Sequence, residues 1–370
     1  MKNSTCRTTA RPQLVRAALA TVIMATGVVD TVSAEPSVTT YATGLNNPRG
    51  LAFGPDGHLY VAEAGLAGTL TATGGPNCPV NFNIYSPYTA GYSGRVSRVL
   101  ADGTTETVAA GLPSMSDQFG GFFGPTDVAF IADTLYVLIE LGGCPHGVTD
   151  DSPAILRVNP DGSTTSVANL NAWHAANPPY YLKDTNPETT DQEPGGVFHS
   201  MIALGRHLYV VETNRGFLLR VDPSSGSIEK LYDMSIDEQE HNPIVMTRRG
   251  NNFYVGTFGE DGGTSELAMF DKSFASYDLS FQSLNPLVGL AWLGKQLYGV
   301  EIFPYDDQWT PDNAILVAFD RETGARTELL TEFASFPNGL IVGPDGALYT
   351  SNWGMSFTGG GDGGVLRIVP

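Results

Sequence analysis

The sequence has few basic residues and few cysteines. Its 370 residues include 20 Lys and Arg against 39 Asp and Glu, which gives a formal net charge of -19. Nucleic-acid-binding proteins need a basic face that displaces counterions, so this charge argues against nucleic acid as a partner. Three cysteines are too few for a disulfide-rich small domain or for a site with four thiolate ligands. With 42% hydrophobic residues, the chain still has enough apolar side chains for a folded core.

The sequence also lacks a hydrophobic run long enough to cross a membrane. The apolar stretch 17–29 follows a basic segment and precedes Val32-Ser33-Ala34, which fits the small-x-small rule for signal cleavage. Residues 1–34 are therefore predicted to be a cleavable signal peptide, and Glu35 to be the first mature residue. An uncleaved anchor is the alternative, but the stretch is too short to span the hydrocarbon core. We expect a secreted or periplasmic protein without membrane insertion.

Cleavage would leave two cysteines, Cys78 and Cys144, in an oxidising compartment. We expect them to form a disulfide, with two buried free thiols as the alternative. His146 lies close to Cys144 and could suggest zinc, but an exported chain with two cysteines favours the disulfide.

The strongest pattern is a hairpin that occurs six times. Each copy has an apolar strand, a short polar turn and a second strand that contains Leu-Tyr or Phe-Tyr. Turn residues such as Pro55-Asp56-Gly57 tolerate the positive φ that tight turns require. The copies span 47–65, 124–142, 198–216, 242–260, 285–303 and 336–354.

A second pair of strands is predicted after most of these hairpins. The pairs span 94–109, 154–168, 216–232, 266–281 and 314–330. Four strands per repeat are typical of a propeller blade, so residues 35–370 are predicted to form one all-β, six-bladed β-propeller. The last repeat has only a third strand, 364–370, and the segment 37–42 is predicted to supply the fourth and close the ring. A stack of β-sandwiches is the alternative, but it would not explain six copies of one hairpin.

Two segments resemble known families. The first hairpin, GLNNPRGLAFGPDGHLYVAEAG (44–65), is similar to those of NHL and SMP-30-type six-bladed propellers. The stretch VANLNAWHAANPPYYLKDTNP (167–187), in which 171–177 is predicted to form a helical turn, resembles the ScyD/ScyE family of exported bacterial proteins. That family is named for a gene cluster for scytonemin, an indole-derived pigment. The resemblance implies an exported propeller near small-molecule chemistry, and Asn214, which matches the family in the turn 212–215, is a candidate ligand-binding residue.

In a propeller the inner strands converge on a central channel, so two sets of residues are predicted to gather at one face. We call the residues where the inner strands begin the start residues, and those where the second strands end the end residues. The start residues are Arg49, Asp127, His199, Asn242, Asn285 and Asn338. The end residues are Glu63, Glu140, Glu212, Glu260, Glu301 and Asn352.

Oxygen ligands from both sets suit Ca²⁺ or Mg²⁺. The predicted metal ligands are Glu63, Glu212, Glu301, Asn338 and Asn352, an arrangement that resembles the metal site of SMP-30-type lactonases. The alternative is that these side chains bind loop backbone or face water. Arg49, Asp127 and Glu140 are candidate ligand-binding residues, and His199 is a possible general base or a structural histidine.

Two functions follow, and the sequence leaves open whether the protein is an enzyme. The first is a noncatalytic accessory module that binds a small molecule or another exported protein, for example in secondary-metabolite handling. The second is a metal-assisted hydrolase or lyase, lactonase-like, that uses the channel carboxylates. We expect a monomer in either case.

Overall fold

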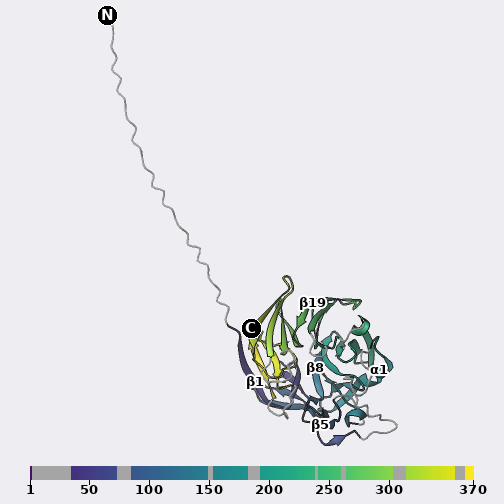
Figure 1. Cartoon of the computed structure of the whole chain (residues 1–370). Coiled ribbons are helices and arrows are strands. Elements are labelled where there is room, and N and C mark those ends of the chain that lie inside the picture. Colours follow the sequence, from purple (N-terminus) through teal and green to yellow (C-terminus); the bar gives the residue numbers. More distant parts are fainter. Residues whose placement is uncertain are drawn as a thin grey trace. The chain divides into compact units, whose positions relative to one another are not determined.

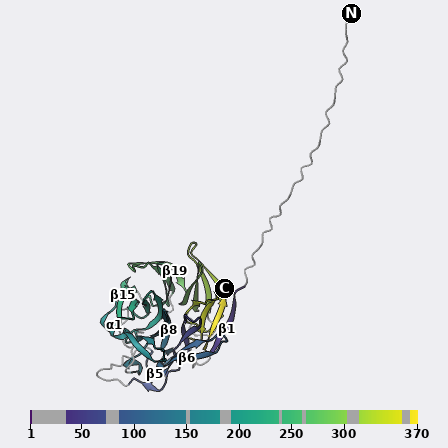
Figure 2. The same cartoon turned by 180° about the vertical axis from the view of Figure 1, so that it is seen from behind.

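The repeated hairpin forms the two inner strands of each sheet in the computed structural model. The structure describes residues 1, 35–72, 85–148, 153–181, 192–237, 241–259, 264–302, 314–354 and 363–370. Over these residues the strands pair antiparallel in six sheets, which surround a common axis (Figures 1 and 2). The predicted all-β, six-bladed propeller is therefore confirmed.

The blades follow the chain in order, each running from the axis outward. Blade 1 has β2 (Pro48–Phe53), β3 (Leu59–Glu63), β5 (Thr89–Val99) and β6 (Thr105–Ser116), with short β4 (Leu70–Thr71) and β7 (Phe122–Phe123) added. Blade 2 has β8 (Pro125–Ile131), β9 (Thr134–Ile139), β10 (Ala154–Val158) and β11 (Thr164–Asn169). Blade 3 has β12 (Phe198–Leu204), β13 (His207–Glu212), β14 (Phe217–Asp222) and β15 (Ser227–Asp233).

The other three blades repeat this order. Blade 4 has β16 (Pro243–Arg249), β17 (Asn252–Thr257), β18 (Ser265–Phe270) and β19 (Tyr277–Leu284). Blade 5 has β20 (Leu287–Leu293), β21 (Gln296–Ile302), β22 (Ala314–Asp320) and β23 (Ala325–Thr331). Blade 6 has β24 (Ile341–Val342), β25 (Leu348–Asn352), β26 (Gly363–Val369) and β1 (Ser37–Leu45).

Blade 6 contains strands from both ends of the propeller sequence. The first strand, β1, pairs antiparallel with the last, β26, from Ser37 opposite Val369 to Leu45 opposite Gly363. Figure 1 shows the C-terminus beside β1. The predicted closing strand is confirmed, and it covers an edge of β26 that would otherwise be open to pairing with another chain.

The short helical elements lie between strands. Helix α1 (Leu170–Ala176) confirms the helical turn predicted at 171–177. Its N-terminus is capped by Asn169, whose side chain accepts a 2.8 Å hydrogen bond from the backbone N–H of Ala172. The 3₁₀ turns η1 (Cys144–His146) and η2 (Met234–Asp237) follow β9 and β15. No helix within the described residues is long and apolar enough to cross a membrane.

The hydrophobic core lies between the blades. One cluster packs Leu138 and Ile155 of blade 2 against Met201 and Val210 of blade 3, and five further clusters fill the other five junctions. Each fully buried Leu, Ile or Val contributes about 1.5–3 kcal/mol to folding. Because each sheet has a neighbour on both faces, the second strands are buried on both sides. In β3, for example, every residue is buried.

The tight turns of the inner hairpins contain residues with the positive φ that the sequence predicts. Gly205, Gly250 and Gly294 have φ values of 62°, 62° and 60° at the turns of blades 3, 4 and 5, a region that glycine enters without steric cost. In blade 2 Ala132 takes this position with a φ of 50°.

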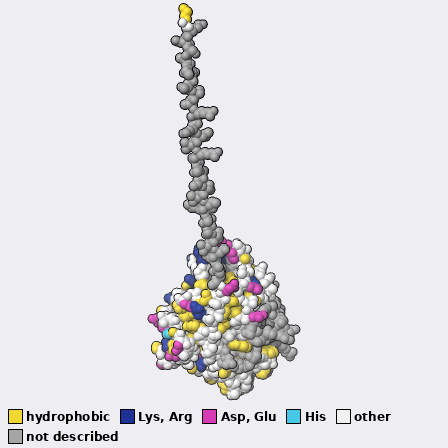
Figure 3. All heavy atoms as spheres, turned by 90° about the vertical axis from the view of Figure 1, so that its left-hand side faces the viewer, with side chains coloured by type: hydrophobic (Ala, Val, Ile, Leu, Met, Phe, Trp, Pro, Cys, Tyr) yellow, Lys and Arg dark blue, Asp and Glu magenta, His cyan; other side chains and the backbone are white. Residues whose placement is uncertain are grey.

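The outer surface carries charges of both signs. On the face shown in Figure 3, Lys and Arg side chains lie among Asp and Glu side chains. The predicted signal peptide, residues 1–34, lies outside the described residues apart from Met1, and so does Cys78. Signal cleavage and the Cys78–Cys144 disulfide therefore stay predictions.

Candidate functional site

Four of the predicted site residues meet near the axis, and they come from four different blades. Arg49 at the start of β2 approaches Glu140, which follows β9, with 3.4 Å between Nη2 and Oε2. Glu140 Oε1 lies 2.9 Å from Nδ1 of His199 in β12. The other ring nitrogen of His199 lies 2.8 Å from the side-chain nitrogen of Asn338, just before β24. The result is one continuous polar chain, Arg49–Glu140–His199–Asn338.

This polar chain is buried. The exposed fractions of the Arg49, Glu140 and His199 side chains are 1%, 2% and 6%. Burial alone would raise the pKa of Glu140, but the charge of Arg49 and the hydrogen bond from His199 hold that pKa below its ordinary value. Arg49 also donates from Nη2 to the backbone carbonyl of Phe122. Glu140 is therefore a buried carboxylate whose charge depends on Arg49.

The hydrogen bonds fix the tautomer of His199. A carboxylate only accepts, so Nδ1 of His199 carries the proton and donates to Glu140. Nε2 then accepts from the amide Nδ2 of Asn338. Both ring nitrogens of His199 are therefore engaged, one by Glu140 and the other by Asn338. His199 consequently orients Asn338, whose Oδ1 atom accepts no hydrogen bond from the described residues.

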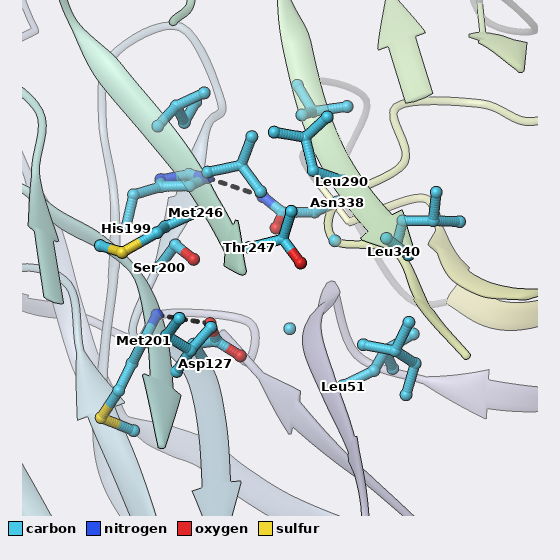
Figure 4. A pocket seen from close by; sticks show the side chains of 18 of the residues that line it. Leu51, Asp127, His199, Ser200, Met201, Met246, Thr247, Leu290, Asn338 and Leu340 are labelled. Carbon is cyan, nitrogen blue, oxygen red and sulfur yellow. Dashed lines mark hydrogen bonds between the residues drawn. The ribbon is translucent and has the colours of Figure 1, made fainter. Parts of the chain in front are cut away.

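A cavity of about 300 Å³ lies beside this polar chain along the axis. Residues of the inner strand region of all six blades line it, and most of them are apolar. Figure 4 shows Asn338 at one side, Asp127 at another and Thr247 between them. The polar side chains of the described lining are Asp127, His199, Ser200, Thr247, Arg248 and Asn338, and Trp292 adds a buried indole N–H that has no partner among the described residues.

Asp127 is the carboxylate of the cavity. Its Oδ1 accepts a 2.8 Å hydrogen bond from the backbone N–H of Val128, and its Oδ2 accepts a 2.7 Å bond from that of Met201. Burial raises the pKa of Asp127 to about 7, although these donors and the Ser200 hydroxyl act in the opposite direction. Asp127 therefore changes charge close to neutral pH.

Gly50 makes room for this carboxylate. A Cβ atom at position 50 would overlap the side chain of Asp127 and lie 2.8 Å from its Cα. Since real Cβ atoms do not approach backbone so closely, glycine is required where β2 passes β8.

The end residues Glu63 and Glu301 bind their own blades. Glu63 accepts from Nε of Arg95 at 2.7 Å and from the backbone N–H of Asn46 at 2.6 Å, and Ser97 donates to it as well. Glu301 accepts from Arg326 at 2.6 and 2.9 Å and from Asn285 at 2.9 Å. Both carboxylates are fully buried and neutralised by an arginine of the same sheet.

The other end residues and Asn214 act in a similar way. Glu212 accepts from the backbone N–H groups of Val197 at 3.2 Å and Arg215 at 2.8 Å. The side chain of Asn352 accepts from the N–H of Ser335 at 2.7 Å, and that of Asn214 accepts from the N–H of Glu193 at 2.9 Å. Each of these side chains fixes a loop beside its strand.

The structure thus does not gather the predicted metal ligands. Asn338 joins the axial chain, whereas Glu63, Glu212, Glu301 and Asn352 stay with their own loops and sheets. The physical reason is that side chains of the second strands face the neighbouring blades rather than the axis. The described residues contain no group of three His, Cys, Asp or Glu side chains that could hold a metal ion, and Glu260 lies outside them. The metal site stays a prediction that the described residues do not support.

His146 belongs to a separate buried cluster. Its Nε2 lies 2.9 Å from Glu193 and its Nδ1 lies 2.7 Å from the carbonyl of Gly142, and Tyr88 donates to the same Glu193. Because both ring nitrogens already have partners, this arrangement fits a structural role better than the zinc site that the neighbouring cysteine could suggest.

Sequence reasoning missed Ser200, Thr247 and Gly50 as parts of the cavity. A signal was present, since Ser200 and Thr247 are polar residues next to apolar runs of inner strands. Which of these positions faces the axis depends on strand register, which the hairpin pattern alone does not set.

Comparisons with known proteins place the chain by its fold. No protein-family model matches it, and no curated protein matches it either. The structure is similar to a putative oxidoreductase (glucose dehydrogenase) from Thermus thermophilus, with a TM-score of 0.55 and 17% identity over 90% of this chain and 100% of that one. It is also similar to a PQQ-bound aldose sugar dehydrogenase from Streptomyces coelicolor, with a TM-score of 0.53 and 14% identity over 91% and 99% of the two chains.

At such low identity these similarities show the fold alone, a six-bladed β-propeller. They do not confirm the resemblance to the ScyD/ScyE family.

Proposed function

We propose that the protein is an exported β-propeller of the ScyD/ScyE type that binds a small molecule in the cavity on its axis. The observation that carries the proposal is the cavity itself: about 300 Å³ of space with largely apolar walls and a few convergent polar groups. This combination is typical of small-molecule sites, and the volume is at the lower end of their range.

The state of His199 favours binding over catalysis. A general base needs a free lone pair within reach of the substrate, and Nε2 of His199 accepts from Asn338 instead. The histidine acts as a positioning residue that fixes the amide of Asn338. The predicted hydrolase would need a metal ion, and its proposed carboxylates already have arginine or backbone partners.

PQQ does not fit the described lining. PQQ carries three carboxylates and requires several cationic or hydrogen-bond-donating groups. The described lining offers one arginine, Arg248, together with the carboxylate of Asp127. Arg248 donates one of its five N–H groups to the carbonyl of Gly250 at 3.0 Å, and a single guanidinium cannot neutralise three carboxylates. We derive no PQQ chemistry for this chain from its similarity to the sugar dehydrogenases.

The wider proposal includes export by residues 1–34, a Cys78–Cys144 disulfide and a monomeric state. The low proportion of basic residues supports a small-molecule or protein partner rather than nucleic acid. A module of this kind would carry or present its ligand outside the cytoplasm.

The test is a binding screen with a panel of small amphipathic molecules, each with an apolar body of about six to ten carbons and one polar group. Binding is measured by thermal shift and calorimetry. Thr247→Phe fills the cavity, because Thr247 lines it, and should abolish binding. Thr327→Phe, on the exposed face of outer strand β23, is the matched control and should bind normally. Binding that Thr247→Phe leaves unchanged would place the ligand elsewhere and refute the proposal.

A further inference from the structure

We infer that the axial cavity selects an organic cation, a primary or secondary ammonium group on a small apolar body, and that Asp127 is its counter-ion. This inference rests on the proposed function and adds the chemical class of the ligand. Three features of the described lining support it: the orientation of Asp127, the orientation of Asn338 and the composition of the walls.

Asp127 is held as a hydrogen-bond acceptor. Each of its two oxygens receives one backbone N–H, from Val128 and from Met201, and the Ser200 hydroxyl donates to the carboxylate as well. An ionised carboxylate has about four acceptor sites, so acceptor capacity remains after these bonds. Figure 4 shows the carboxylate turned toward the open space of the cavity. A ligand that donates hydrogen bonds there would complete its coordination.

Asn338 presents a second acceptor to the same space. Its Nδ2 group is committed to Nε2 of His199, and His199 is fixed in turn by Glu140. The amide oxygen is consequently the free end of Asn338, and Figure 4 shows it on the cavity side. The Thr247 hydroxyl, which also lines the cavity, can accept as well. A ligand with several N–H donors matches this set.

The walls specify the rest of the ligand. Apart from the polar residues, the described lining is built from aliphatic side chains, methionines and the Trp292 ring, with Leu51, Met201, Met246, Leu290 and Leu340 among them. Such walls favour a hydrocarbon body because burying apolar surface contributes about 25 cal/mol per Å². A polyol would place hydroxyl groups against these walls without partners, at a cost for each unpaired group.

The position of the charges favours a cation beside Asp127. The charged or titratable side chains of the described lining are Asp127, His199 and Arg248. Nε2 of His199 faces Asn338, and the guanidinium of Arg248 lies at the β16–β17 turn, where it donates to the carbonyl of Gly250 in a bond exposed to solvent. An anion would meet the carboxylate of Asp127 at close range. The net charge of -19 also raises the local concentration of cations near the protein.

The experiment compares three molecules of nearly equal shape by calorimetry: cyclohexylmethylamine, cyclohexylmethanol and cyclohexanecarboxylate. At pH 8 the amine should bind at least about tenfold more tightly than the alcohol, since it forms an ion pair with a desolvated carboxylate. The carboxylate should bind weakest. Lowering the pH to about 5.5 protonates Asp127, whose pKa lies at about 7, and should reduce the affinity for the amine but not for the alcohol.

Asp127→Asn removes the charge and should bring the amine to the affinity of the alcohol. The variant places an amide N–H₂ against a backbone donor and could fail to fold. The pH series on the wild-type protein is the second measurement and does not depend on the variant. Near pH 7 amine binding should also release protons, seen as a buffer-dependent heat.

The outcomes separate the two proposals. If the alcohol binds as tightly as the amine at every pH, the cation inference is wrong and the proposed channel binding stands. If the carboxylate binds best, the inference is equally wrong. If neither these three molecules nor the wider panel binds in a way that Thr247→Phe abolishes, both proposals fail.

Discussion

The start residues and the end residues belong to the same repeated hairpin, yet they have different roles. Arg49, His199 and Asn338 begin inner strands and join across the axis with Glu140. Glu63 and Glu301 end second strands and bind arginines of their own sheets. Inner strands have no neighbour on the axial side, whereas second strands have a blade on either face. The comparison teaches that a repeated polar residue can be structural while the unrepeated ones beside it form the site.

Glu140 is the informative exception. It is an end residue by position, but it bonds to Arg49 of blade 1 and His199 of blade 3 rather than to an arginine of blade 2. Its neighbours thus decide its role. A carboxylate at an end position contributes to the axial site only where adjacent blades supply its partners.

The largest expected effect comes from removing the charge partner of Glu140. Arg49→Leu should lower the free energy of unfolding by about 3–5 kcal/mol, because it leaves a buried carboxylate unpaired. Arg95→Leu is the matched change, because Arg95 is the charge partner of the end residue Glu63. Glu63 keeps Ser97 and a backbone N–H as donors, and the loss there should be about 1.5–3 kcal/mol. Denaturant unfolding measures both, and equal losses would contradict the distinction between the two sets.

A smaller effect is expected in the pH dependence of stability, where Asp127 should differ from exposed carboxylates. Folding raises the pKa of Asp127 to about 7, from about 4 in the unfolded chain. The folded state therefore binds this proton more tightly, and Asp127 should lower stability as pH rises from about 4 to 7. Urea unfolding across this range should show a flatter profile in Asp127→Asn than in the wild type. Thr104 lowers the pKa of the exposed Asp102, so Asp102→Asn should change stability only in more acid solution and leave the profile from about pH 5 to 7 unchanged. A wild-type profile in Asp127→Asn would contradict the assignment.

Glu140 should act in the opposite direction at lower pH. Its folded pKa is held below the ordinary value, so the stability it contributes is present above its unfolded pKa. That contribution is lost as the pH falls through the folded pKa. In acid, below the ordinary pKa of a glutamate, the wild type should therefore lose more stability than Glu140→Gln, as measured by urea unfolding followed by circular dichroism. An identical acid profile in the two proteins would mean that Arg49 does not stabilise the ionised form.

Gly50→Ala tests whether the position of Asp127 matters for ligand binding, because it adds a single methyl group beside this carboxylate. The added methyl group meets the side chain and Cα of Asp127, and overpacking of this kind costs about 1–3 kcal/mol. Ligand binding should fall more than stability, because the carboxylate must move. Calorimetry with cyclohexylmethylamine and denaturant unfolding measure the two effects. Unchanged binding would show that the position of Asp127 is not critical.

The smallest effect on ligand binding is expected from the end residues. The double variant Glu212→Gln and Glu301→Gln should leave binding in the channel unchanged, since neither residue lines the cavity. Elemental analysis of wild-type and variant protein tests the metal prediction at the same time. Stoichiometric Ca²⁺ or Mg²⁺ that only the wild type holds would show that these carboxylates form an ion site after all.

Much of the fold could be predicted from the sequence. The hairpin repeat defined six blades, and the truncated last repeat required a strand from residues 37–42, which the pairing of β1 with β26 confirms. Both predictions rest on local sequence patterns. These are the alternation of apolar and polar residues in strands and the residue types typical of tight turns, and each involves only a few neighbouring positions.

The site was predictable only in part. The start positions correctly brought Arg49, His199 and Asn338 to one region, but their bonds to one another depend on how blades 1, 2, 3 and 6 are set against each other. The relative placement of the blades results from side-chain packing at the six junctions between them. The sequence of a single hairpin does not determine this packing. The direction of a side chain does not follow from its position at the end of a strand. Glu63 and Glu301 lie at the predicted ends of their strands but pair with arginines of their own sheets instead of lining the channel.

The pairing of β1 with β26 also has a consequence for how the protein reaches its native state. The first and the last strand of the propeller form one sheet, so the sixth blade cannot assemble until β26 has been made. Blades 1 to 5 can form earlier, but the ring stays open until β26 pairs with β1. A circularly permuted chain, joined from Pro370 to Pro36 and cut in an exposed hairpin, would form that sheet as a local hairpin and should fold faster than the natural order.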